Sequence, residues 1–107
     1  MMQKVENASC IRFVAVTTQT IYMEIRYRTT KHCGSFIGYR HDIPKIMDLQ
    51  RDCLTKYDIL HKLMHALGFR HEHKREDRDH YVTVNRENIR PKDYRKNFAK
   101  WNTFTTT

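Results

Sequence analysis

The histidines within residues 61–71 constrain this chain more than any other feature of its sequence. His61 and His65 are four residues apart, so on a helix their rings project from the same side. Gly68 follows them and precedes His71. A glycine at this point can end the helix in a left-handed conformation and redirect the chain, which would let His71 swing back as a third ligand. Three neutral imidazoles leave one open position on tetrahedral zinc, the layout of a catalytic rather than a structural site.

The segment that carries the first two histidines is the best-defined helix of the sequence, at about residues 55–68. Thr55 and Asp58 fit the capping-box pattern at its start. Apolar residues then recur at helical spacing and form a core-facing stripe: Leu60, Leu63, Met64 and Leu67. We therefore expect a helix that begins after Thr55, ends at Gly68 and presents the two histidines beside its buried face.

Strands are expected ahead of this helix. Four segments are candidates, with the second the clearest and the last the weakest: residues 10–16, 22–28, 35–40 and 46–49. In the second segment the alternation places Met23, Ile25 and Tyr27 on one face. Short strands followed by one well-capped helix are therefore the expected local structure.

Charge and length bound the possible partners. The chain has 107 residues, enough for one small domain, and a formal net charge of +8. Its basic residues lie in both halves with acids among them, so the charge indicates a solvated surface before a nucleic-acid-binding one. No stretch is apolar and long enough to cross a bilayer, and none resembles a signal peptide. The polar residues 102–107 are expected to fray.

The three cysteines, Cys10, Cys33 and Cys53, make an odd count. In a reducing compartment they would behave as three small hydrophobic residues. In an oxidising compartment two of them would pair and one would be left over. A glycosylation sequon at residues 7–9 weakly favours the secretory route. The residues by themselves leave both alternatives open.

Residues 61–84 resemble the zinc signature of the astacin family of metzincin endopeptidases, HExxHxxGFxHExxRxDRDxYVxI, at nearly every fixed position except Lys62. The segment that starts at Cys10 is similar to the strand that opens the family's domain. The resemblance implies an α+β fold, the upper lobe of a zincin-like domain with a twisted, mostly parallel sheet and the metal-bearing helix. It also implies a secreted protein and hydrolysis of peptide bonds by zinc-activated water.

The resemblance assigns roles along the whole chain, read as a partial astacin-like peptidase domain. It implies that His61, His65 and His71 hold one zinc ion. It also implies that Cys33 and Cys53 form a disulfide, with Cys10 left without its family partner. The expected segments are the end of a first helix (residues 1–9), strands (10–54), the metal helix and turn (55–73), a post-metal segment (74–101) and the frayed tail (102–107).

Lys62 is the main departure from the family. The family has a glutamate here that acts as general base on zinc-bound water, and an ammonium group cannot accept a proton. A full charge about 5 Å from Zn²⁺, at an effective dielectric of about 20, would be repelled by roughly 6 kcal/mol. The simpler role for this lysine is an ion pair with Asp58 one turn earlier. We also expect the chain to lack the family's lower lobe, with its methionine turn and zinc-binding tyrosine.

The remaining motif residues are expected to be structural or exposed. Glu72 matches the acid that receives the mature N-terminus in the family, and a plain surface acid is an equally good interpretation. His73 and His80 lie outside the ligand pattern and are expected on the surface. A charged cluster that braces the chain after the metal loop is matched by Arg75, Asp77 and Arg78.

We therefore predict a zinc metalloendopeptidase domain of this family that is inactive or severely impaired. Its expected partner is a peptide or protein substrate, with no nucleic acid and no membrane, and the sequence does not determine an oligomeric state. The first alternative is a non-catalytic pseudo-peptidase that binds peptides or zinc. A basic nucleic-acid-binding module is the weaker alternative, because no recognition helix or aromatic stacking set supports it.

Overall fold

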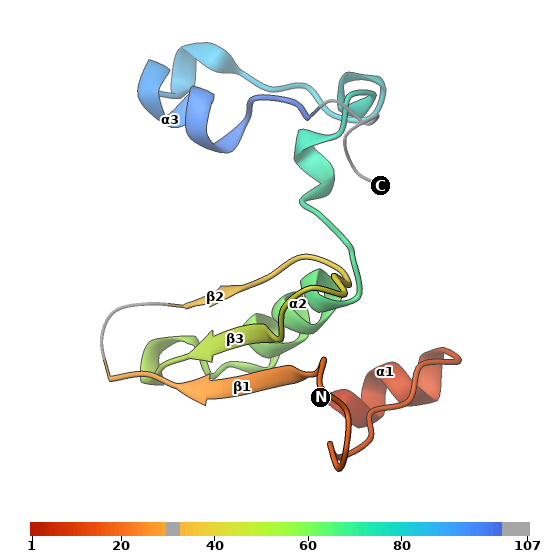
Figure 1. Cartoon of the computed structure of the whole chain (residues 1–107). Coiled ribbons are helices and arrows are strands. Elements are labelled where there is room, and N and C mark those ends of the chain that lie inside the picture. Colours follow the sequence, from red (N-terminus) through yellow and green to blue (C-terminus); the bar gives the residue numbers. More distant parts are fainter. Residues whose placement is uncertain (30–32, 102–107) are drawn as a thin grey trace. The chain divides into compact units, whose positions relative to one another are not determined.

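The computed structural model describes residues 1–29 and 33–101, and the chain forms two compact units, residues 1–70 and residues 71–107. The elements of the first unit, coloured red to green in Figure 1, are α1 (Met2–Ala8), β1 (Met23–Tyr27), β2 (Gly34–Ser35), β3 (Lys45–Leu49), a 3-10 helix (Arg51–Cys53) and α2 (Lys56–Ala66). Within residues 71–101 the second unit holds 3-10 helices at Glu72–Lys74, Arg78–His80 and Arg86–Asn88, followed by α3 (Pro91–Asn97).

The described helices are short, and α2, with 11 residues, is the longest of them. Across residues 1–29 and 33–101 there is no helix with the length and apolar character needed to span a membrane. The tail that was predicted to fray, residues 102–107, lies outside the described residues.

The sheet of the first unit is mixed, in the order β1-β3-β2. β1 pairs in parallel with β3 along the full length of both strands, and β2 pairs antiparallel with the other edge of β3. Helices together with this small sheet confirm the predicted α+β fold. The strands predicted at residues 22–28 and 46–49 are confirmed as β1 and β3, and the expected first helix is confirmed as α1.

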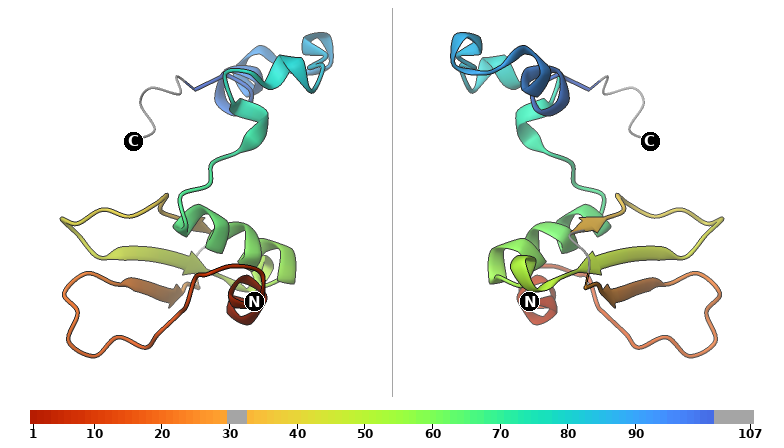
Figure 2. Two further views of the ribbon diagram at one scale, coloured as in Figure 1. Left: turned by 90° about the vertical axis from the view of Figure 1, so that its right-hand side faces the viewer. Right: turned by 90° about the vertical axis from the view of Figure 1, so that its left-hand side faces the viewer.

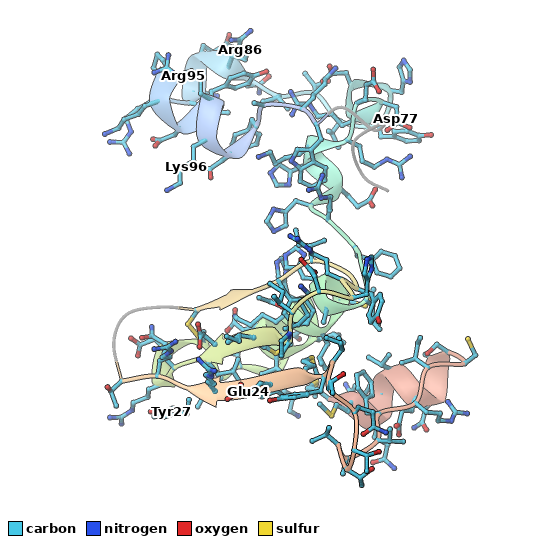
Figure 3. The ribbon with its side chains drawn as sticks, viewed as in Figure 1. Glu24, Tyr27, Asp77, Arg86, Arg95 and Lys96 are labelled. Atoms are coloured by element: carbon cyan, nitrogen blue, oxygen red, sulfur yellow. A yellow bond between two sulfur atoms is a disulfide. The ribbon has the colours of Figure 1, made fainter. Side chains whose placement is uncertain are left out.

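Apolar and charged residues alternate along β1. In the parallel register Ile25 lies beside Met47 and Tyr27 beside Leu49, so the predicted apolar residues of β1 share one face, but Ile25 and Tyr27 are 45% and 63% exposed. The alternate positions of β1 are charged, and there Arg26 forms an ion pair with Glu24 at 2.8 Å. Figure 3 shows Glu24 and Tyr27 on β1.

The core of the first unit is small and lies between the sheet and α2, which runs along one face of the sheet (Figure 2). Met47 of β3 and Leu63 of α2 are 0% and 1% exposed. The Ser35 hydroxyl of β2 donates a hydrogen bond of 3.3 Å to the carbonyl of Lys62, which ties the helix to the edge strand. Among the described residues the other buried apolar side chains are Val5 and Cys53.

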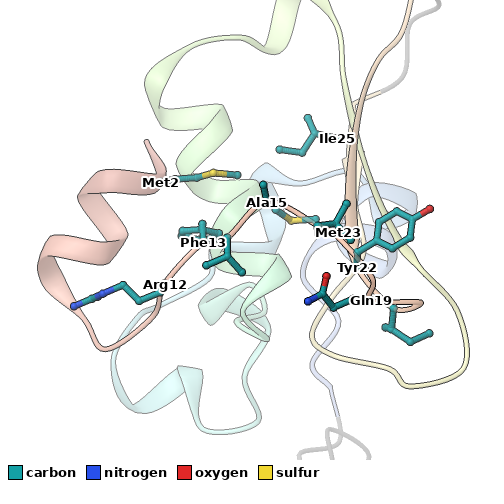
Figure 4. Close-up of a pocket in the computed structure, with 11 residues that line it drawn as sticks. Met2, Arg12, Phe13, Ala15, Gln19, Tyr22, Met23 and Ile25 are labelled. Carbon is teal, nitrogen blue, oxygen red and sulfur yellow. The ribbon is translucent and has the colours of Figure 1, made fainter.

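Two predicted strands were wrong in whole or in part. Residues 10–16 form no strand. The Phe13 amide donates to the Glu6 carboxylate at 2.8 Å rather than to a neighbouring strand, and the Arg12 guanidinium donates to the Glu6 carbonyl at 3.0 Å. This segment instead lines a cavity of about 500 Å³ together with β1 (Figure 4). Of residues 35–40 only Ser35 is in a strand, and Gly38 turns the chain at a φ of 69°.

The disulfide expected from the family resemblance is present. Cys33 and Cys53 are bonded, with Cα atoms 6.5 Å apart, and join the start of β2 to the 3-10 helix before α2. Cys10 is free and exposed, as expected. Because so few side chains are buried, a covalent link contributes a large share of the stability of this unit.

Removing this disulfide is expected to destabilise the first unit by about 3 kcal/mol, since the bond closes a loop across a sequence separation of 20 residues. The variant carries Cys33→Ser and Cys53→Ser together, and denaturant unfolding of the oxidised protein measures the difference. Cys10→Ser is the matched control and is expected to unfold like the parent. Equal stability of all three proteins would contradict the prediction.

The second unit has little regular structure and is assembled around Arg78, which is 4% exposed. Its guanidinium donates hydrogen bonds to the His73 carbonyl at 2.9 Å, to the Tyr94 hydroxyl at 3.1 Å and to the Phe98 carbonyl. It also contacts the Asp79 carboxylate at 3.1 Å. One buried cation therefore joins the loop after residue 71 to the helix α3, as expected for the bracing cluster.

Candidate metal centre

α2 begins and ends where the sequence predicts. The Thr55 side chain accepts a hydrogen bond of 3.2 Å from the amide of Asp58, which caps the N-terminus. At the other end Gly68 has a φ of 105°, a left-handed conformation that glycine adopts without strain. Its amide donates to the His65 carbonyl at 2.9 Å, and the Phe69 amide donates to Met64 at 3.0 Å. These two bonds form a Schellman motif.

Gly38 holds the preceding loop against this helix end. Its amide donates to the same His65 carbonyl at 2.9 Å. A Cβ atom at Gly38 would lie 3.6 Å from the Cα of Gly68, so the two backbones are in van der Waals contact. The carbonyl of His65 therefore accepts two hydrogen bonds, which fix the last turn of α2, the turn that carries His65.

His61 and His65 lie together on α2, as their spacing predicts. Their ring centroids are 4.5 Å apart and the ring planes are 83° to each other. His61 is exposed and His65 is half-buried, so both rings are accessible to an ion from solvent. A pair of this kind supplies two ligands from one rigid helical turn.

A backbone contact sets the orientation of the His65 ring. Its Nδ1 lies 2.7 Å from the carbonyl oxygen of Phe69. Because a carbonyl only accepts, Nδ1 carries the proton and Nε2 is the nitrogen with an available lone pair. Metal-ligating histidines commonly have their second nitrogen held by a carbonyl in this way.

The electrostatic surroundings favour the neutral form of His61. Although the residue is exposed overall, desolvation by the atoms packed against its ring lowers its pKa, and the neighbouring His65 and Lys62 lower it further, against a smaller opposing effect of Asp58. A neutral imidazole is the form that binds a metal ion, so this environment fits the donor set.

His71 is close to the other two histidines because of the short chain that connects them. It comes two residues after Phe69, and two residues of chain span at most about 7 Å. One ring nitrogen from each of His61, His65 and His71 lies within 4.8 Å of the others. Tetrahedral zinc with bonds of about 2.1 Å would bring such nitrogens to about 3.4 Å, so small side-chain rotations are enough.

Lys62 differs from its expected role. It is 7% exposed and lies on the buried side of α2, next to Leu63. The predicted ion pair with Asp58 is absent, because the Asp58 carboxylate instead accepts a hydrogen bond from the Thr55 hydroxyl. Among the described residues, every side-chain nitrogen that is fully buried has a hydrogen-bond partner. Within the same residues the Lys62 ammonium has no hydrogen bond of this kind, so it is not fully buried. The ammonium group therefore keeps contact with solvent while its alkyl chain is buried.

The charged residues after the metal segment brace the chain, as expected. Arg75 contacts Asp77 at 2.9 Å and Glu72 at 3.3 Å. Hydrogen bonding and charge from Arg75 lower the pKa of Asp77. The Glu72 side chain is 73% exposed, in agreement with its interpretation as a surface acid.

His73 is exposed, as expected, but it also makes a long-range contact that the sequence did not reveal. Its Nε2 lies 2.7 Å from the carbonyl of Asn97 in α3. The two residues are 24 positions apart, and no local spacing links them. His80, the other histidine predicted on the surface, is exposed.

Comparison with known proteins agrees with this geometry. The model of the Astacin peptidase family matches residues 1–107. The chain belongs to the astacin family. It is 40% identical over 102 residues to the Embryonic protein UVS.2 of Xenopus laevis. That match covers 95% of this chain and 19% of that protein. It is 42% identical over 98 residues to the Zinc metalloproteinase nas-14 of Caenorhabditis elegans, covering 90% of this chain and 19% of that protein.

A solved astacin also shares the fold. High choriolytic enzyme 1, a hatching enzyme zinc-protease from Oryzias latipes, superposes with a TM-score of 0.78 at 38% identity. The match covers 95% of this chain and 50% of that one, so the chain spans half of its length. Astacins are zinc proteases, and zinc is the cofactor that this family membership assigns to the chain.

Proposed function

We propose that this chain is a zinc-binding astacin domain that holds one ion through His61, His65 and His71 and hydrolyses peptides poorly or not at all. The grouping of one nitrogen from each histidine within 4.8 Å carries the metal part of the proposal. The lysine at position 62 supports the other part, the weak or absent hydrolysis of peptides. As the domain spans half of its solved relative, its activity and substrates are inferred from the domain's own residues.

The residues around the site would prepare it for an ion before one binds. The His65 ring is oriented by the Phe69 carbonyl at 2.7 Å, and desolvation with the neighbouring His65 and Lys62 lowers the pKa of His61, which favours its neutral form. Bound zinc would supply Lewis acidity toward a water molecule or a peptide carbonyl. Taking up the proton of that water requires a basic side chain, and the Lys62 ammonium cannot accept one.

The proposed setting is extracellular, with a peptide or protein as substrate or ligand. The bond between Cys33 and Cys53 supports this setting, since disulfides persist in oxidising compartments and are rare in the cytosol. The main alternative within the proposal is a pseudo-peptidase that captures peptides without cleaving them, which Lys62 also favours.

Zinc binding by the purified chain tests the proposal. Calorimetry at fixed pH is expected to give one bound zinc per chain, released by a chelator. His61→Ala removes one of three ligands and is expected to weaken binding at least about 100-fold, while His41→Ala, at an exposed histidine outside the group, leaves it unchanged. A parent that binds no zinc, or a His61→Ala variant that binds like the parent, would overturn the assignment.

Activity is measured on the same preparations. The zinc-loaded parent is expected to show no chelator-sensitive cleavage of casein above the His61→Ala background. Robust cleavage that the chelator abolishes would mean that another group supplies the base. Retention of a labelled peptide without cleavage would favour the pseudo-peptidase within this proposal.

A further inference from the structure

A series of ring contacts in the second unit connects α3 to His71. Tyr94 of α3 stacks on Phe98 with ring centroids 6.2 Å apart, and Phe98 meets His73 edge-on at 5.4 Å. His73 in turn stacks on His71 at 5.7 Å, with 27° between the ring planes. All three distances lie within the range of about 4.5–7 Å at which aromatic pairs attract each other.

His73 is the best-anchored member of this series. Its ring nitrogen Nε2 lies 2.7 Å from the Asn97 carbonyl, so it donates a hydrogen bond to the last residue of α3. Its own carbonyl accepts a hydrogen bond of 2.9 Å from the buried guanidinium of Arg78. The same guanidinium binds the Tyr94 hydroxyl and the Phe98 carbonyl, which fixes the residues beyond His73 as well.

His71, by contrast, lies outside the helices and strands. It precedes the 3-10 helix Glu72–Lys74, and its carbonyl accepts a hydrogen bond of 3.0 Å from the Lys74 amide. Its ring also stacks on Trp101, with centroids 6.4 Å apart. Neighbouring rings therefore limit the orientations of the His71 ring more than its backbone does.

We infer that His73 is a positioning residue for His71, which holds the third imidazole in an orientation suited to metal binding. This inference rests on the proposed function, because it concerns the same zinc ion. An unrestrained side chain loses rotamer freedom when it binds, and restricting it beforehand lowers that cost. His73 acts through ring stacking and is itself no ligand, since it lies outside the group His61, His65 and His71.

The test compares zinc affinity and cobalt absorption spectra of five chains: parent, His73→Ala, His73→Phe, His71→Ala as the ligand-loss reference, and His80→Ala. His73→Ala removes both the ring and its hydrogen bond to Asn97, and is expected to weaken zinc about 10-fold and to alter the cobalt bands at an unchanged stoichiometry of one ion. His73→Phe keeps a ring against His71 and is expected to restore most of the affinity. His80→Ala removes another exposed histidine of the same unit and is expected to match the parent.

Each outcome separates this inference from the proposed function. If the parent binds zinc and His73→Ala matches it in affinity and cobalt spectrum, the positioning role is wrong while the zinc site stands. If His73→Ala loses zinc as completely as His71→Ala, and His73→Phe does too, His73 is a ligand and the inference is overturned. Affinity lost by His73→Ala and recovered by His73→Phe supports stacking as the mechanism, even where the alanine variant is less stable.

Discussion

Replacing Arg78 with alanine is expected to destabilise the second unit by about 3–5 kcal/mol. The change removes hydrogen bonds to the carbonyls of His73 and Phe98 and to the Tyr94 hydroxyl, all made by a side chain that is 3% exposed. Each hydrogen bond to a charged group contributes about 1.5–3 kcal/mol. Water can reach some of the freed acceptors, so the total is expected to fall below the simple sum.

Arg75→Ala provides the matched control, because it removes the same side chain three residues away in the same unit. Arg75 also binds two acids, but its side chain is 49% exposed, and exposed ion pairs contribute little. Amide hydrogen exchange across residues 71–101 measures the effect in each variant. We expect a large loss of protection for Arg78→Ala and little change for Arg75→Ala. Similar protection in the two variants would show that Arg78 does not hold the unit together.

Replacing Lys62 with glutamine is expected to tighten zinc binding about 10- to 100-fold. The full repulsion of roughly 6 kcal/mol holds for a charge about 5 Å from the ion at an effective dielectric of about 20. The lysine is 7% exposed with its ammonium in contact with solvent, so screening reduces the effect to a fraction of that figure. Glutamine removes the charge and keeps a polar end, on a stem of two methylenes where lysine has four.

Lys56→Gln is the control for this change, since it removes an equal charge from an exposed position at the start of the same helix. It is expected to change zinc affinity little. The advantage of Lys62→Gln over the parent should shrink as salt rises, because salt screens a charge that retains solvent contact. Equal affinities for the parent and Lys62→Gln at low salt would mean that the ammonium points away from the ion.

The local features of the metal segment could be predicted from sequence because each depends on residues only a few positions apart. Thr55 caps its own helix, and His61 and His65 share a side through the helical repeat. Gly68 ends the helix because glycine alone adopts a φ of 105° without strain. The strand β1 could also be predicted, because the side chains of a strand point to opposite faces at successive residues and give an alternating pattern.

The tertiary structure determined the contacts between residues that are far apart in the sequence. Residues 10–16 have a strand-like pattern, but the Phe13 amide donates to the Glu6 side chain of α1. Gly38 turns the chain and donates to the His65 carbonyl 27 residues later. His73 is exposed as predicted, but no local pattern reveals its contact with Asn97, which lies 24 positions away. The burial of Lys62 likewise follows from packing of α2 on the sheet. Sequence therefore determined the ligand spacing and the helix that carries it, whereas long-range hydrogen bonds and packing determined what surrounds the third histidine and the lysine.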